Sequence, residues 1–244
     1  EQGKDVTFLV RPKRKASLEK NGLVINSVNG NYAFQPKLIT AQQDVEPFDI
    51  VLLSSKAYHL EQSIEDLRPF VGPNTVIIPL LNGIAHIATL QQAFGRERVL
   101  GGLCIIETTL DPLGEVSHTS EHIKRDMWHK YLMITVLSSV TTLMHAPIGP
   151  IRDSEGGKPY IEAMYQEVAS IMQAHQAPIS EDIVKRYMKS LDNLSYHFKT
   201  SMQRDMERGL NIEGQHIQGY ILSLANQYDL PAPLLTSVYQ NLNV

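Results

Sequence analysis

The chain is poor in cysteine and has no long hydrophobic run, and each absence excludes a class of protein. Cys104 is the only cysteine among 244 residues, which excludes an internal disulfide framework and suits a reducing compartment. No apolar stretch approaches the roughly 20 residues that cross a bilayer, and no signal peptide is recognisable. We therefore expect a cytoplasmic protein with no membrane partner.

Charge is also scarce and mixed in sign. Charged residues make up 20% of the chain and the formal net charge is −4, which argues against nucleic acid as a partner. Metal-binding spacings such as HExxH and CxxC are absent, so we expect no metal site. The hydrophobic fraction of 43% is that of a globular protein, and the length allows one large domain or two ordinary ones.

The first half of the chain alternates predicted strands with helices. The strand candidates are short, apolar and rich in β-branched residues: Val6–Val10, Asp49–Ser55, Thr75–Leu81 and Val99–Ile106. Helical spacing of apolar residues follows the second candidate, at Leu60, Ile64 and Leu67, and also the third, over 84–94. This alternation predicts a mostly parallel sheet covered on both faces. The Asn29-Gly30 turn predicts an inserted antiparallel pair, and residues 114–120 an edge strand.

The second half is helical. Helices are predicted near 122–145, 159–176, 180–208, 213–228 and 232–242, with breaks at prolines and glycines such as Pro147 and Gly149. The predicted architecture is a Rossmann-like α/β domain over 1–120, followed by an all-α domain over 121–244, with the boundary near 118–122. Apolar helical faces after Asn211 can pack internally or against a second subunit in a homodimer.

Polar residues follow three of the predicted strands. Arg11 follows the first strand, Lys56 the next, and Asn82-Gly83 the third. Ligands of doubly wound sheets bind outside the carboxyl ends of the strands, so these side chains are expected to converge. Two cations and an amide suit a phosphorylated ligand such as a dinucleotide, although each residue taken singly can be a solvated loop residue.

The run "RPKRK", Arg11 through Lys15, bears on the choice of cofactor. An NAD site usually has an acid after its second strand, whereas arginine suits the extra phosphate of NADP. The run has no acid until Glu19, so we expect NADP(H), with a basic solvated turn as the alternative. The expected Gly-x-Gly-x-x-Gly loop does not occur in 1–244. We expect that loop and its strand to precede Glu1.

Lys130 lies in an unusually apolar part of the predicted helix 122–145. Met127, Met133 and Ile134 lie three or four positions from it, and Leu137 lies seven positions along, on the same side of the helix. The simpler interpretation, favoured on this helix alone, is that the stem packs while the ammonium reaches water. The alternative is that the ammonium lines a cleft and donates protons to a bound molecule.

Several motifs in this order resemble the ketopantoate reductases (2-dehydropantoate 2-reductases). They are "GKDVTFLVR", "SSKAY", "LLNGI", "MWHKYL" and "SMQRDMERGLNIEGQHIQGYI". The resemblance implies a Rossmann domain and a helical domain that close on NADPH and a 2-oxo acid. It also implies reduction of ketopantoate to pantoate for pantothenate and coenzyme A synthesis.

The resemblance also implies roles for individual residues. It makes Lys130 the catalytic general acid, with Glu213 beside it as a second catalytic residue. Substrate contacts are implied for Ser201, Asn82 and Ser138, and cofactor contacts for Arg11, Lys56 and Asn82. Without the resemblance, Glu213 would be an ordinary acid in the first turn of a helix, and Ser201 a surface serine.

The sequence departs from the family pattern in two places. The family commonly has asparagines four and eight residues after its catalytic lysine, where this chain has Ile134 and Ser138. Loss of an amide makes the pocket more apolar, so the alternatives are a reductase of a less polar 2-oxo acid, or a non-catalytic NADP-binding regulatory protein. The short span before "DMWHKYL" suggests that residues are missing around Ser120–Glu121.

Overall fold

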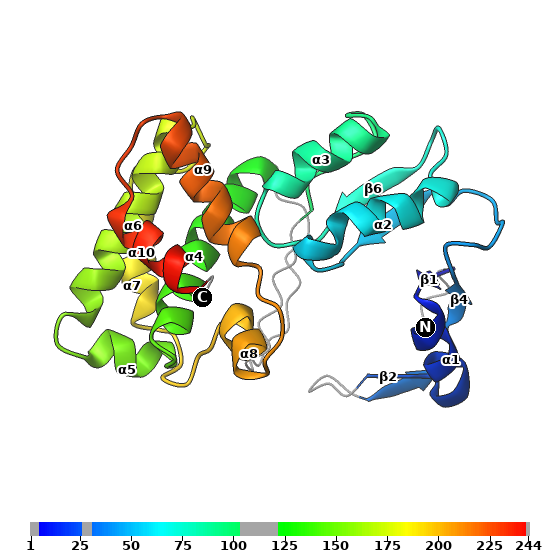
Figure 1. Ribbon diagram of the computed structural model, residues 1–244, viewed down its shortest axis with the longest axis horizontal. Coiled ribbons are helices and arrows are strands. Elements are labelled where there is room, and N and C mark those ends of the chain that lie inside the picture. Colours follow the sequence, from blue (N-terminus) through cyan, green and yellow to red (C-terminus); the bar gives the residue numbers. More distant parts are fainter. Residues whose placement is uncertain (1–4, 26–30, 103–121, 243–244) are drawn as a thin grey trace.

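The computed structural model of the protein describes residues 5–25, 31–102 and 122–242. It has a Rossmann-like part followed by an all-helical part, as the sequence predicted (Figure 1). We call residues 5–102 the strand lobe and residues 122–242 the helical lobe. The domain boundary predicted near 118–122 falls largely outside the described residues, as do the edge strand over 114–120 and the chain start.

The strands of the strand lobe pair mainly in parallel. β1 (Thr7–Leu9) pairs with β4 (Lys37–Ile39), and β5 (Ile50–Leu53) pairs with β6 (Val76–Pro79). A single parallel bridge joins Val99 to Ile77. β2 (Leu23–Ile25) and β3 (Tyr32–Phe34) form the predicted antiparallel pair, whose turn lies outside the described residues.

Two helices cover one face of the β5–β6 pair. α2 (Leu60–Leu67) and α3 (Ala85–Phe94) share a core with Val51 and Leu53, which point to the same face of β5. Ile50 and Leu52, on the opposite face, are 60% and 63% exposed. The expected cover on both faces is therefore wrong for the described residues, because both helices pack on the same side.

The basic run after β1 is helical rather than a turn. α1 (Pro12–Asn21) begins at a proline, which has the required φ and needs no amide partner in the first turn. It ends at Gly22, where φ is +69°. Only Leu18 of this helix is buried. Apolar periodicity could not reveal a helix with one buried residue. Shorter 3₁₀ turns, η1 (Ala57–His59) and η2 (Arg68–Phe70), flank α2.

The helical lobe is built around its first helix, α4 (Ile123–Leu143). Its other helices are α5 (Ile148–Asp153), α6 (Gly157–Ala174), α7 (Ile183–Leu191), α8 (Ser201–Glu207), a π-helical turn η3 (Gln215–Gly219), α9 (Tyr220–Gln227) and α10 (Pro233–Leu242). α4 contacts α6, α8, α10 and η3, so it is buried on most sides. A helix in this position must be apolar around much of its circumference, which explains the apolar neighbours of Lys130.

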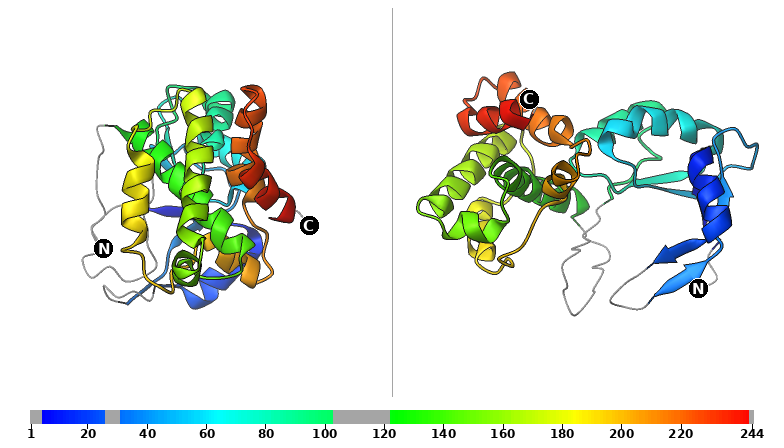
Figure 2. Two further views of the ribbon diagram at one scale, coloured as in Figure 1. Left: turned by 90° about the vertical axis from the view of Figure 1, so that its left-hand side faces the viewer. Right: turned by 60° about the horizontal axis from the view of Figure 1, so that its bottom comes forward.

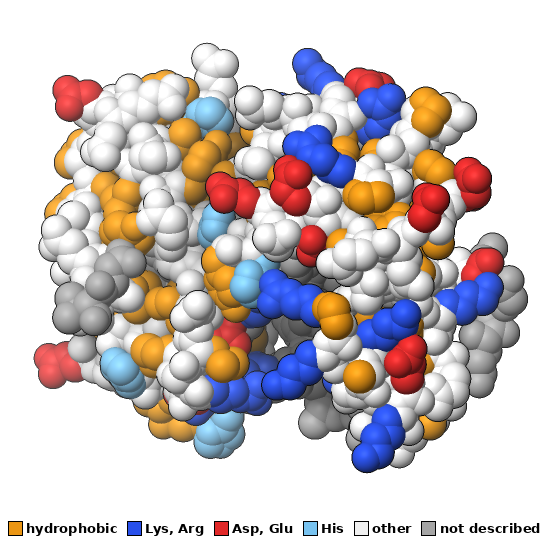
Figure 3. Space-filling view, turned by 45° about the vertical axis from the view of Figure 1, so that its right-hand side comes forward, with side chains coloured by type: hydrophobic (Ala, Val, Ile, Leu, Met, Phe, Trp, Pro, Cys, Tyr) orange, Lys and Arg blue, Asp and Glu red, His pale blue; other side chains and the backbone are white. Residues whose placement is uncertain are grey.

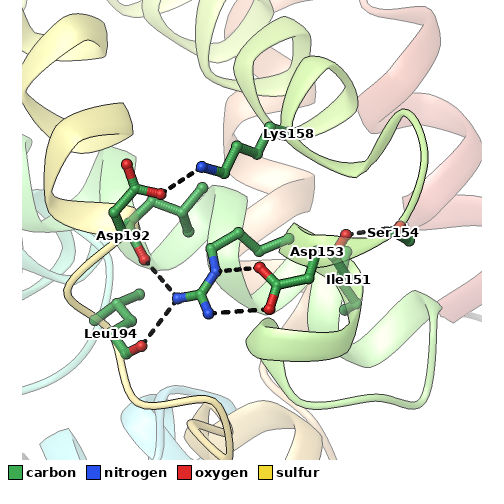
Figure 4. A network of polar contacts seen from close by, with 8 residues as sticks. Ile151, Asp153, Ser154, Lys158, Asp192 and Leu194 are labelled. Carbon is green, nitrogen blue, oxygen red and sulfur yellow. Dashed lines mark hydrogen bonds and ion pairs between the residues drawn. The ribbon is translucent and has the colours of Figure 1, made fainter.

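The single helix predicted over 180–208 is wrong. α7 ends at Leu191 and α8 begins at Ser201. The guanidinium of Arg152 donates from Nη1 to the carbonyl oxygens of Leu191, at 3.2 Å, and Leu194, at 3.0 Å (Figure 4). These carbonyls therefore have a partner from α5, and the chain turns instead of continuing the helix.

The helix α5, which supplies Arg152, was also missed. Proline and glycine near its start predict a break, yet Pro147 is the N-cap and Pro150 falls in the first turn, where no amide partner is needed. The amides of Ile148 and Gly149 donate to carbonyls of Phe198 and Tyr196 at 2.9 and 3.1 Å. Donors of α5 thus bond to the carbonyl oxygens of the segment that follows α7.

The two lobes meet through α8 and η3. The right-hand view of Figure 2 shows these orange segments on the side of the helical lobe that faces the strands. In the described residues, no helix combines the length and hydrophobicity needed to cross a bilayer. The same residues contain no group of three His, Cys, Asp or Glu side chains that could hold a metal ion.

Candidate active site

Lys130 and Asn82 line the same pocket, although they belong to different lobes. The other lining residues are Leu81, Gly83, Gly102, Met127, Tyr131 and Ile134. Lys130 is half-buried and reaches this pocket from α4, while Asn82 enters from the loop that follows β6. The free volume is about 10 Å³, close to the room that one water molecule needs.

A glycine allows the loop after β6 to approach the helical lobe closely. Gly83 has φ of +82°, a left-handed conformation that favours glycine. A Cβ atom at this position would lie 3.4 Å from the carbonyl oxygen of His216 in η3. The "NG" motif therefore places the Asn82 amide against the helical lobe.

Glu213, two residues before η3, connects the two lobes through its carboxylate. The carboxylate is buried, and its Oε1 accepts a hydrogen bond from the backbone amide of Ala57 at 2.9 Å. Its Oε2 accepts from Nδ2 of Asn82 at 3.3 Å and lies 3.9 Å from Nζ of Lys56. The structure thus brings together Lys56, Asn82 and Glu213, three of the predicted site residues.

Lys56 makes its shortest contact with a residue that the sequence reasoning missed. Its Nζ donates to Oδ2 of Asp205 at 2.6 Å. Burial lowers the pKa of Lys56, but the hydrogen bond to Asp205 and the charges of Glu213 and Asp205 outweigh it and raise the pKa above its usual value. Lys56 is therefore an ammonium at neutral pH. Asp205 follows Ser201 by four residues, and that spacing was the available signal.

Ser201 and Arg11 lie outside this set of contacts. Ser201 is exposed at the start of α8, one helical turn before Asp205 and on the same side of the helix. Arg11 is the exposed N-cap of α1. Within the described part of the chain, neither side chain is hydrogen-bonded to Lys56, Asn82 or Glu213. Their roles in binding stay predictions.

Ser138 is buried one turn beyond Ile134 and is not among the residues that line the pocket. Its Oγ accepts a hydrogen bond from Nε2 of Gln218 at 2.9 Å, and Ser139 accepts from the same nitrogen at 3.0 Å. Ile134, which does line the pocket, contributes an apolar side chain to its wall. The substrate contact predicted for Ser138 also stays a prediction.

The family description "Ketopantoate reductase PanE/ApbA" matches residues 1–127, and its C-terminal counterpart matches residues 122–244. The chain belongs to the ketopantoate reductase family. It is thus an oxidoreductase that acts on a CH–OH group. This family assignment agrees with the resemblance carried by the five sequence motifs.

A relative from Bacillus subtilis, the "uncharacterized oxidoreductase YkpB", is 39% identical to this chain. The alignment spans 279 positions and covers 100% of this chain and 92% of the relative. Because it has more positions than this chain has residues, internal segments of the relative have no counterpart here.

Two solved structures share the fold. A 2-dehydropantoate 2-reductase from Geobacter metallireducens has a TM-score of 0.84 at 22% identity, covering 99% of this chain and 92% of that one. A D-mandelate dehydrogenase, in a ternary structure with NADH and anilino(oxo)acetate, has a TM-score of 0.83 at 16% identity, covering 99% and 93%. At these identities the similarity establishes the fold alone.

The residues at the strand ends fit a dinucleotide. Ser55 follows β5, and its buried Oγ has no hydrogen-bond partner among the described residues. It adjoins Lys56, whose ammonium is half-exposed, and the loop of Asn82 follows β6 next to it. Figure 3 shows a hollow between the lobes with Lys and Arg side chains around it. Polar and positively charged side chains at the carboxyl ends of parallel strands suit an anionic nucleotide.

Proposed function

We propose that this chain is an NADPH-dependent reductase of 2-oxo acids, with ketopantoate as substrate, pantoate as product and Lys130 as the general acid. The observation that supports this proposal most directly is the pocket shared by Lys130 and Asn82. It adjoins the carboxylate of Glu213, which bonds to Asn82. The product would serve pantothenate and coenzyme A synthesis.

The proposed chemistry needs a proton donor at the ketone oxygen. When bound, the cofactor supplies a hydride to the carbonyl carbon of the 2-oxo acid. The carbonyl oxygen then gains negative charge, and the ammonium of Lys130 donates a proton to it. The Asn82 amide stabilises the same oxygen as a hydrogen-bond donor, or orients the carboxamide of the cofactor.

The remaining residues act in binding. Glu213 accepts a hydrogen bond from a substrate hydroxyl and holds Asn82 in place, while Ser201 donates to the substrate carboxylate. Lys56, Arg11 and Ser55 bind the cofactor from the carboxyl ends of the strands. The arginine is the basis for proposing NADPH rather than NADH.

Loss of nicotinamide absorbance tests the proposal, with purified full-length protein, NADPH or NADH, and a panel of 2-oxo acids. We expect oxidation of NADPH with ketopantoate, and roughly a hundredfold or greater loss of turnover in Lys130→Ala. Lys124→Ala, at an exposed position on the same helix, is the matched control and should retain full activity. No oxidation with any acid would favour a cofactor-binding regulatory protein. A loss below about threefold in Lys130→Ala would return Lys130 to a packing role.

A second candidate is the same reaction on a less polar 2-oxo acid. It is supported by the apolar wall of the pocket, where Leu81, Met127 and Ile134 face the same space as Lys130. D-mandelate dehydrogenase, which shares the fold, is named for an aromatic substrate. In the same panel, a higher kcat/KM for an acid with an apolar side chain than for ketopantoate would favour this candidate. Ile134→Asn should shift the ratio toward ketopantoate.

The cytoplasmic location and the homodimer remain part of the proposal. Leu224, Leu235 and Val238, in the tail after Asn211, are buried within the helical lobe itself. Packing within the chain, the alternative to packing against a second subunit, therefore accounts for part of the apolar surface of this tail. Light scattering of the full-length protein distinguishes a monomer from a dimer by mass.

A further inference from the structure

Tyr131, the residue after Lys130 on α4, is fully buried and is bonded to the π-helical turn η3. Its hydroxyl donates to the carbonyl oxygen of Ile217 at 2.6 Å and lies 3.4 Å from that of His216. Its ring lies between Trp128 and Tyr220, with centroid distances of 5.9 and 6.4 Å. The hydroxyl is therefore the polar end of an otherwise apolar, tightly packed side chain.

The same two residues of η3 hold the backbone of Glu213. The amides of His216 and Ile217 both donate to the carbonyl oxygen of Glu213, at 3.1 and 2.9 Å. A π-helical turn is wider than an α-helical one, and such turns are uncommon and often occur at functional sites. Tyr131 gives the carbonyls of this turn a donor from outside the helix.

A continuous set of bonds therefore runs from α4 to the carboxylate at the lobe junction. It passes from the Tyr131 hydroxyl to Ile217, from the Ile217 amide to Glu213, and from the Glu213 carboxylate to Asn82. Successive residues on an α-helix point about 100° apart, so α4 presents Lys130 to the pocket, while Tyr131 lines the same pocket and its hydroxyl reaches η3. One helix thus carries Lys130 and is bonded, through Tyr131, to the turn that holds the backbone of Glu213.

We propose that Tyr131 is a positioning residue, which sets the place of the Glu213 carboxylate relative to Lys130 by holding η3 in its π-helical form. This inference rests on the proposed function only for its kinetic consequence. The structural consequence, a hydroxyl-dependent stability of η3, is independent of any activity.

Tyr131→Phe tests the inference, because it removes the hydroxyl and keeps the ring. Loss of one buried hydrogen bond is expected to raise KM for the 2-oxo acid about tenfold, with KM for NADPH within about twofold. Tyr165→Phe is the matched control, since Tyr165 is equally buried and its ring stacks on Tyr187 at 5.4 Å, away from η3. The control should leave both KM values unchanged.

Two further measurements separate positioning from general stability. If Tyr131 acts through Glu213, Tyr131→Phe should have little effect on KM in a Glu213→Ala background, where the carboxylate is gone. An effect as large as in the wild type would overturn the proposal. Hydrogen exchange of the amides over 214–219 should be about tenfold faster in Tyr131→Phe than in Tyr165→Phe. Equal exchange in both variants would overturn the proposal even if the enzyme had no turnover. If the exchange result holds but the wild type does not oxidise NADPH, only the proposed function is contradicted.

Discussion

Replacing Glu213 by alanine should weaken catalysis more than replacing it by glutamine, for a reason that can be worked from its partners. In Glu213→Ala the buried amide of Ala57 loses its acceptor, which costs about 1–3 kcal/mol. The bond from Asn82 is also lost, and the half-exposed Lys56 contributes no more than about 1 kcal/mol after solvent screening. The expected loss in kcat/KM is about 2–4 kcal/mol, or roughly 30- to 1,000-fold.

Glu213→Gln keeps the acceptor that matters most. The amide oxygen of glutamine can still accept from Ala57, and Asn82 can rotate its own amide to present an oxygen to the new NH₂ group. Only the negative charge is lost. We expect a loss of about 1 kcal/mol in this variant, or roughly fivefold.

Steady-state kinetics at saturating NADPH, with kcat and KM for the 2-oxo acid measured separately, provide the comparison. Glu207→Ala is a suitable control because Glu207 pairs with Lys199 on the partly exposed side of α8 and should change kcat/KM less than twofold. Equal losses in the alanine and glutamine variants would refute the reasoning, since acceptor geometry would then be irrelevant. So would values within twofold of the wild type for both.

Three further predictions concern charge and protonation. A small primary amine such as ethylamine should restore part of the activity of Lys130→Ala, because the truncation makes room for the amine. It should not restore the activity of Lys130→Met, in which the side chain still fills the pocket. Equal rescue of both variants would contradict the role of Lys130 as an acid. Asp205→Asn removes the 2.6 Å partner of Lys56 and should tighten NADPH binding about two- to fivefold at low salt, measured by calorimetry; unchanged or weaker binding would argue against Lys56 as a phosphate ligand. Burial, with a smaller effect from His216, lowers the pKa of His86 from 6.5 to about 4. As the pH falls, His86 is therefore protonated in the unfolded chain before it is protonated in the folded protein. The free energy of unfolding should fall by about 3 kcal/mol between pH 6.5 and pH 4. Urea unfolding across that range should show a flatter slope in His86→Gln, and the same slope in both proteins would be the contrary result.

The strand ends were predictable because their position follows from topology. Lys56 and Asn82 come after neighbouring parallel strands, so both had to emerge at the same edge of the sheet. Predicting that Glu213 joins them required the family motif. Nothing in the local sequence around Glu213 indicates that this acid contacts the other lobe. Lys130 was ambiguous for a related reason: a central helix such as α4 surrounds any of its polar residues with apolar neighbours.

The features that were missed depend on contacts between distant segments. The break after α7 follows from Arg152, which donates to Leu191 and Leu194 across about 40 positions of sequence, and no propensity at the break itself predicts it. Asp205 and Gln218 were overlooked because their partners, Lys56 and Ser138, lie far away in the chain. Tertiary hydrogen bonds of this kind leave no periodic signal.

The small volume beside Lys130 has a kinetic consequence. If the proposed 2-oxo acid binds beside Lys130, a space that admits about one water molecule is too small for it, and we expect the lobes to separate for loading and release. We expect separation to break the contacts of Glu213 with Ala57 and of Lys56 with Asp205, and closing to restore them. Product release should then slow as the contacts between the lobes strengthen, so we expect a variant with a more stable junction to have a lower kcat.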